Sequence, residues 1–222
     1  EWKILSSANL HERERHIWNL IVEKQSDLRN RDRDADWFEL KGRIAKEGWT
    51  ASVLREFRTT CRPRVNITPP FGIGASKPPT ANWERIRFED LGQVEVSFFL
   101  RRNEDLNVTD EALPEVFRIL EDQLTVASGL LADVGTTHIS TPTCYPNRET
   151  RLGRRLAKNA GFMELFIKIF DRLAVLQPRI ASAHTLTWPE SDVYFFRKLK
   201  LYALSKANIF SAQDAAEAIL SL

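Results

Sequence analysis

Apolar residues recur at helical spacing over much of this 222-residue chain. The clearest pattern lies in residues 161–222, where positions i, i+3, i+4 and i+7 repeat as one continuous apolar stripe. This stripe consists of Phe162, Leu165, Phe166, Ile169, Phe170, Leu173 and Ala174. We expect Pro178 to end or offset the helix, because proline cannot continue a helical hydrogen-bond ladder. The pattern therefore predicts a helix with one buried face.

Two further helices are expected after Trp188-Pro189. The first has Ser191 as its N-cap and carries Val193, Phe195, Phe196, Leu199, Tyr202, Ala203 and Leu204. The second begins at Ser211, with Asp214 three residues later in a variant of the capping box. Because a short amphipathic helix cannot bury its apolar face alone, we expect these helices to pack on one another.

Similar periodicity predicts helices earlier in the chain. They are expected at residues 7–22, 36–47, 50–61, 109–135 and 148–158. Gly48 is expected to end one of them and Thr50 to begin the next. Thr109 is the expected cap of the long helix, which tolerates Pro114 in its first turn and ends at Gly135.

Two central segments depart from the helical pattern. Residues 62–80 hold five of the ten prolines, so we expect an ordered loop or a linker there. In residues 83–100, Val94, Val96 and Phe98 alternate as in a strand, but no partner strand is evident and we expect a helix. The chain is thus divided into helical parts at 1–61 and 81–222, which can also form one continuous domain.

These patterns together predict an all-α fold of about eight to ten helices. Exact internal repeats are absent from the sequence, although a helix followed by a Pro or Gly break recurs. We therefore expect either an irregular helical-repeat, solenoid-like arrangement or a layered helical bundle.

Composition adds few constraints. The chain has 32 basic and 30 acidic residues, so no global field attracts nucleic acid or anionic lipid. No run of 18 apolar residues exists, and we expect no membrane segment. Cys61 and Cys144 are too few for a disulfide framework or a four-cysteine zinc site, which favours a reducing cytoplasm. Because the chain starts at Glu1 and its helical pattern continues to Leu222, we expect a fragment of a longer protein.

A basic face is expected on the helix at residues 148–158. Arg148, Arg151, Arg155 and Lys158 lie at helical spacing and can meet phosphates or an acidic partner. One alternative function is therefore a nucleic-acid-binding helical module. The balanced total charge instead favours a solvated or salt-bridged face.

The segments around Cys144 and Trp188 each have a functional and a structural interpretation. Cys144 lies between Pro142 and Pro146, and a thiol-dependent enzyme would need His138 or His184 as its base. The favoured interpretation is a buried thiol that helps to order the loop. Trp188 is a candidate for an exposed binding residue, although a tryptophan next to a helix start more often packs into a helix corner.

The segment from Gly161 to Leu222 resembles the α-helical C-terminal regions of large bacterial antiphage defence proteins. The resemblance is carried by Phe166, Phe170-Asp171-Arg172-Leu173, Trp188-Pro189-Glu190-Ser191-Asp192, Phe195-Phe196, Lys198-Leu199-Lys200-Leu201-Tyr202-Ala203, Ile209-Phe210-Ser211 and Ala218-Ile219-Leu220-Ser221-Leu222. Such regions often follow a sirtuin-like NAD-hydrolysing domain. The resemblance implies a helical scaffold that assembles the protein or senses a phage component, with the chemistry in another domain.

The sequence therefore predicts a non-catalytic scaffold or sensor module of a larger bacterial protein, located in the cytoplasm. We expect a protein partner or self-association, and no catalytic, metal or cofactor-binding residues in this chain. The expected interaction surface comprises Arg148, Arg151, Arg155, Lys158 and Trp188.

Overall fold

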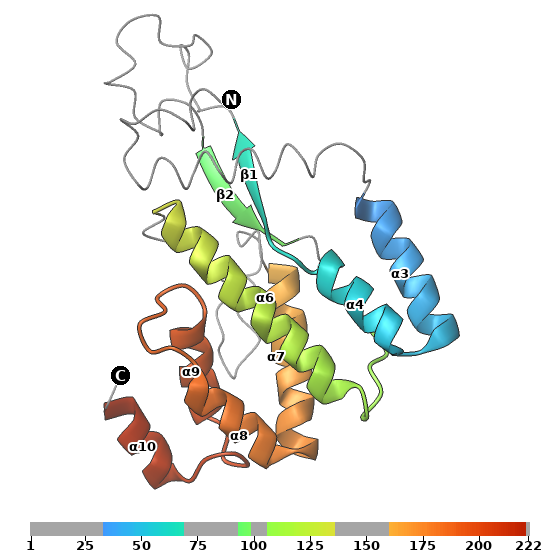
Figure 1. Ribbon diagram of the computed structural model, residues 1–222. Coiled ribbons are helices and arrows are strands. Elements are labelled where there is room, and N and C mark those ends of the chain that lie inside the picture. Colours follow the sequence, from blue (N-terminus) through green and yellow to red (C-terminus); the bar gives the residue numbers. More distant parts are fainter. Residues whose placement is uncertain (1–32, 69–92, 99–105, 136–159, 221–222) are drawn as a thin grey trace, which may run out of the picture.

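The computed structural model of the chain describes residues 33–68, 93–98, 106–135 and 160–220 (Figure 1). These ranges contain seven helices and a single two-stranded sheet, so the predicted all-α class is confirmed for the described residues. The helices form a bundle, and a solenoid-like repeat stays a prediction. The centre of the bundle is the crossing of α6 (Leu113–Asp133) over α7 (Ala160–Leu176).

Aromatic side chains fill the contact between α6 and α7. The ring centroid of Phe117 lies 5.2 Å from that of Phe166 and 5.9 Å from that of Phe170. Trp188 extends the cluster, with centroids 5.6 Å from Phe170 and 5.9 Å from Phe196. Such tilted pairs add to the free energy gained by burying the rings. One buried core then runs through the described elements, from Trp37 to Ala203.

The first two described helices have the predicted ends. α3 (Arg33–Glu47) ends at Gly48, whose φ of 68° is in the left-handed region that glycine adopts without strain. α4 (Ala51–Thr60) begins at Thr50, whose hydroxyl accepts a hydrogen bond from the Val53 N–H at 3.4 Å. Both helices bury their apolar faces, and α4 also packs on α6.

Two strands replace elements that the sequence predicts differently. β1 (Arg64–Thr68) and β2 (Gln93–Ser97) pair antiparallel, with Val65 opposite Val96. The expected loop over 62–80 is therefore wrong at its start, and the expected helix over 83–100 is wrong over β2. The partner that β2 needs is β1, which lies within the Pro-rich segment. Phe98, just after β2, stacks on Phe162 of α7 with centroids 3.9 Å apart.

The start of α6 differs from the prediction. The residue before its first turn is Ala112, and no side chain caps the helix, so Thr109 is not its N-cap. Residues 108–110 are instead held by Arg172 of α7, which donates to the Val108 carbonyl at 2.8 Å and pairs with the Asp110 carboxylate at 2.7 Å. Pro114 lies in the first turn and Gly135 follows the helix end, as expected.

The C-terminal part contains one helix more than predicted. α7 ends two residues before Pro178, and Pro178 is the first residue of α8 (Pro178–Thr187). Proline is tolerated at this position because the N–H group that it lacks has no partner within the helix. The N-cap of α9 (Phe196–Leu204) is Phe195, so Ser191 does not cap it, and Asp192 holds the turn before the helix. The Asp192 carboxylate accepts hydrogen bonds from the backbone N–H groups of residues 194, 195 and 196.

The last helix, α10 (Ala212–Leu220), has the predicted capping box. The Asp214 N–H donates to the Ser211 hydroxyl at 3.1 Å, and the Ser211 N–H donates back to the Asp214 carboxylate at 3.3 Å. In Figure 1, α10 lies at the outer end of the bundle, next to α9. The helices expected at 7–22 and 148–158 lie outside the described residues.

The α6–α7 contact predicts a large difference between two phenylalanine truncations. Phe166→Ala should lower the free energy of unfolding by about 3–5 kcal/mol, because it leaves a cavity beside Phe117 and Trp188. Phe38→Ala, on the exposed side of α3, should change it by about 0.5 kcal/mol or less. Urea denaturation measures both values, and equal effects would contradict the assigned core.

The turn that Asp192 holds before α9 gives a second prediction. Asp192→Ala should destabilise the protein by about 1–2 kcal/mol, because three N–H groups lose their acceptor. Ser191→Ala is the matched control at the neighbouring exposed position, with an expected change of about 0.5 kcal/mol or less. A larger loss in the Ser191 variant during thermal unfolding would contradict the role given to Asp192.

Candidate functional site

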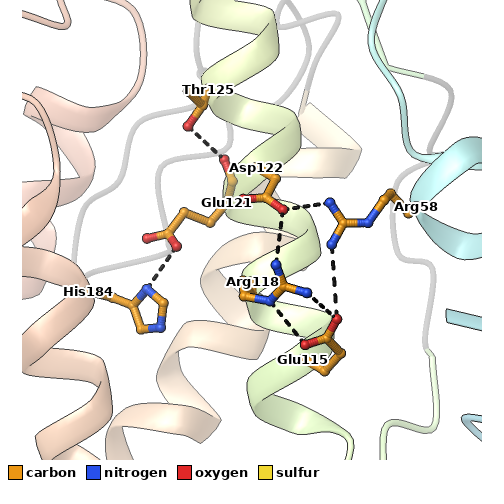
Figure 2. Close-up of polar contacts among 7 residues, drawn as sticks. All are labelled: Arg58, Glu115, Arg118, Glu121, Asp122, Thr125 and His184. Carbon is orange, nitrogen blue, oxygen red and sulfur yellow. Dashed lines mark hydrogen bonds and ion pairs between the residues drawn. The ribbon is translucent and has the colours of Figure 1, made fainter. Parts of the chain in front are cut away.

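Charged side chains of α6 form contacts on both sides of the helix (Figure 2). On one side they meet Arg58 of α4, and on the other side they meet His184 of α8. We refer to these two groups as the α4-side network (Arg58, Glu115, Arg118, Asp122) and the Glu121 triad (Glu121, His184, Trp188). They differ in burial, so their energetic roles differ.

The α4-side network is exposed to solvent and joins two helices. Arg58 lies 2.7 Å from the Asp122 carboxylate, and Arg118 contacts Glu115 at 2.5 Å and Asp122 at 3.7 Å. The hydrogen bond from Arg118 holds the pKa of Glu115 below its usual value. Because exposed ion pairs are screened by water and salt, this network orients α4 on α6 more than it stabilises the fold.

The Glu121 triad is more buried. The Glu121 side chain is 15% exposed, and its two oxygens have separate partners. One accepts a hydrogen bond from the Trp188 indole N–H at 2.5 Å, and the other lies 2.8 Å from His184 Nδ1. The His184 ring also meets Phe117 edge to face, with centroids 5.0 Å apart. The triad thus connects α6 with the last turn of α8 and with Trp188, the residue that follows that helix.

The carboxylate of Glu121 is in a costly environment. Burial raises its pKa above the usual value for glutamate, while the hydrogen bond from Trp188 and the charge of His184 oppose that rise. A raised pKa means that the ionised form is less favourable in the folded state than in the unfolded one. Glu121 therefore lowers the stability of the fold as pH rises through its pKa.

The triad has a defined hydrogen-bonding geometry. When Glu121 is ionised its oxygens can only accept, so in that state His184 Nδ1 donates the hydrogen bond. Among the described residues, Glu121 is the one side chain that forms a hydrogen bond with the His184 ring. The arrangement fixes the ring and ties α8 to α6 through the core tryptophan. We interpret it as a clamp between helices.

One signal in the sequence points to Glu121. It lies four residues after Phe117 and three before Leu124, beside the mainly apolar buried face of α6. A carboxylate at such a position needs buried donors. Its partners, His184 and Trp188, are more than sixty residues away in sequence, so the sequence does not identify them.

A second polar group joins α9 to α7. The Tyr202 hydroxyl donates to the Asp171 carboxylate at 2.8 Å, and Lys206 lies 2.9 Å from the same carboxylate. Burial raises the pKa of Tyr202. Lys200 is buried and pairs with Glu190 at 2.8 Å. These contacts fix α9 on the bundle and leave its outer side towards solvent.

The residues expected to form the interaction surface have different locations. Trp188 is 3% exposed and lies in the aromatic core, so it is not a surface residue and the packed-corner interpretation is confirmed. Arg148, Arg151, Arg155 and Lys158 lie outside the described residues, as does Cys144. The other cysteine, Cys61, is in the core, and its burial raises the pKa of the thiol.

Apolar side chains also lie on the outside of α8. Its solvent-facing arc consists of Arg179, Ile180, Ala183, Leu186 and Thr187. We refer to Ile180, Ala183 and Leu186 as the α8 stripe. Leu186 is 61% exposed, and Val175 and Leu176 at the end of α7 are exposed beside the start of the helix. Contiguous exposed apolar residues of this kind are typical of contact surfaces.

The apolar side of α10 is uncovered as well. We refer to Ala212, Ala215, Ala216, Ile219 and Leu220, which share one side of the helix, as the α10 face. Leu220 is 88% exposed, and no residue of this helix is buried. The predicted helix therefore forms and contacts α9, but, contrary to expectation, none of its residues is buried.

The Glu121 triad and the α4-side network give a third prediction. Glu121→Ala should lower the free energy of unfolding by about 1–3 kcal/mol, because the buried Trp188 N–H loses its acceptor. Glu121→Gln should cost less, since the amide oxygen can accept the same hydrogen bond. Arg118→Ala, in the exposed network, should cost about 1 kcal/mol or less in the same denaturation experiment.

Equal losses for Glu121→Ala and Arg118→Ala would show that the triad does not act as a clamp.

In the described part of the chain, no group of three His, Cys, Asp or Glu side chains is arranged to hold a metal ion. The helices described there also lack the length and apolar character needed to cross a bilayer. Comparisons with protein-family models, with curated proteins and with solved structures find no match to the chain.

Proposed function

We propose that this chain is a non-catalytic helical module that assembles with a protein partner through the apolar sides of α8 and α10. The proposal depends on the exposure of α10, because this nine-residue helix has no buried residue. An isolated helix of this length is marginal in water, even with a capping box. A partner that covers the α10 face would supply the missing burial.

The energetic gain from such a partner is substantial. Full burial of a leucine or isoleucine side chain is worth about 1.5–3 kcal/mol. Ile219 and Leu220 of α10, with Ile180 and Leu186 of α8, are all exposed. A small number of such side chains supplies most of the free energy in many protein interfaces.

The resemblance to antiphage defence proteins extends the proposal. It concerns the segment from Gly161 to Leu222, which includes the helices with uncovered apolar sides. We propose that the module belongs to a larger bacterial defence protein in the cytoplasm. In that protein it assembles subunits or senses a phage component, while the chemistry lies in another domain.

Phage plating on bacteria that express the gene of the larger protein, with this chain inside it, tests the proposal. The wild-type gene should reduce the number of plaques, and the I219E/L220E variant should lose this protection because two charges now lie on the α10 face. Circular dichroism of the purified variant should show unchanged helix content, since both residues are exposed.

F38E, on the exposed side of α3 and away from both apolar surfaces, is the control and should keep the protection. Equal plaque numbers with and without the wild-type gene would contradict a defence role. Full protection by a folded I219E/L220E variant would contradict the role of α10.

A further inference from the structure

We propose that the partner of the α10 face is the α8 stripe of a second copy of this chain, in a symmetric dimer. This inference rests on the proposed function and names its partner. The two surfaces lie on different helices of one chain, and both are exposed at the same time. Neither therefore covers the other within a single copy.

The charges of the two helices are complementary. α8 has one cation on its outer arc, Arg179, and contains no acidic residue. No hydrogen bond or ion pair joins the Arg179 side chain to another described residue, and this side chain is exposed beside Ile180. A cation next to an uncovered apolar stripe favours an apolar partner with an acidic edge.

α10 has the matching properties. It contains Asp214 and Glu217 and no basic residue. Asp214 is used by the capping box, whereas Glu217 accepts one hydrogen bond from Gln213. Glu217 lies about 60° around the helix from Leu220, at the edge of the α10 face. Docking the α10 face on the α8 stripe can therefore bring Glu217 to Arg179.

Size and shape fit the same pairing. α8 has ten residues and α10 has nine, so the helices are about 15 and 14 Å long and match along their whole length. Ala183 lies within the α8 stripe, and three alanines lie within the α10 face, which lets the helix axes approach closely. In a two-fold symmetric dimer the contact between the α10 face and the α8 stripe forms twice. The apolar sides of α8 and α10 are then covered in both copies.

Sedimentation velocity over a range of protein concentrations tests the proposal. The wild-type chain should dimerise, and I180E/L186E and I219E/L220E should each weaken dimerisation by about tenfold or more. R179E and E217K should each weaken it, and the R179E/E217K double variant should recover the wild-type dissociation constant. F38E, on the exposed side of α3, is the control and should dimerise as the wild type does.

A mixing experiment identifies the two surfaces as partners. I180E/L186E keeps a normal α10 face, and I219E/L220E keeps a normal α8 stripe. Mixed in equal amounts, they should form a heterodimer with one intact contact, although each alone is monomeric. Helix content by circular dichroism should match the wild type in both.

A monomeric wild-type chain, or two variants that do not associate when mixed, would overturn the second-copy proposal. If I219E/L220E still loses phage protection in that case, the proposed function survives with a different partner. If dimerisation follows the prediction and phage protection is absent, the defence role fails and the dimer stands.

Discussion

Phe117 of α6 lies against Phe166 and Phe170 of α7, and the other described elements are arranged around these two helices. α4 and β2 pack on α6, α8 packs on α7, and α3 packs on α4. Removal of apolar surface from water is the main driving force for this arrangement. The direction of each neighbouring helix then depends on polar contacts, because apolar packing alone permits several orientations.

Three polar contacts provide that orientation at different depths. Arg58 joins α4 to α6 at the surface, and Arg172 holds the backbone before α6. Glu121 lies deeper and receives the Trp188 N–H inside the aromatic core. A buried carboxylate contributes little net stability, because its loss of hydration offsets much of the hydrogen-bond energy. Its main consequence here is geometric, since α8 can approach α6 only where both oxygens of Glu121 meet their donors.

The sequence predicts the long amphipathic helices well because their apolar faces are buried. The stripe from Phe162 to Ala174 and the glycine after α3 give local signals that the structure confirms. α8 is different: its apolar residues face outward, so a search for a core-facing stripe overlooks it. β1 and β2 are separated by residues 69–92, and neither strand indicates its partner locally. The N-cap of α9 is Phe195, four residues after the predicted Ser191, because the Asp192 carboxylate holds a turn of backbone before the helix.

The candidate site is less predictable than the fold for the same reason. Glu121 is visible as a carboxylate on an apolar face, but its partners come from residues 184 and 188. Tryptophan is common at binding surfaces, so the sequence allows Trp188 to be a binding residue. Only the three-dimensional packing shows that Trp188 is in the core. The exposure of the α8 stripe and the α10 face also follows from tertiary structure, since the same apolar residues could have been buried.

The central claim is that these two apolar surfaces are open in a single copy and covered on assembly. Hydrogen–deuterium exchange of the chain at increasing protein concentration measures this directly, because amide exchange in a marginal helix slows when a partner stabilises it. We expect slower exchange in α8 and α10 at high concentration, with unchanged exchange in α3. Exchange in α8 and α10 that is independent of concentration, and already as slow as in α7, would contradict it.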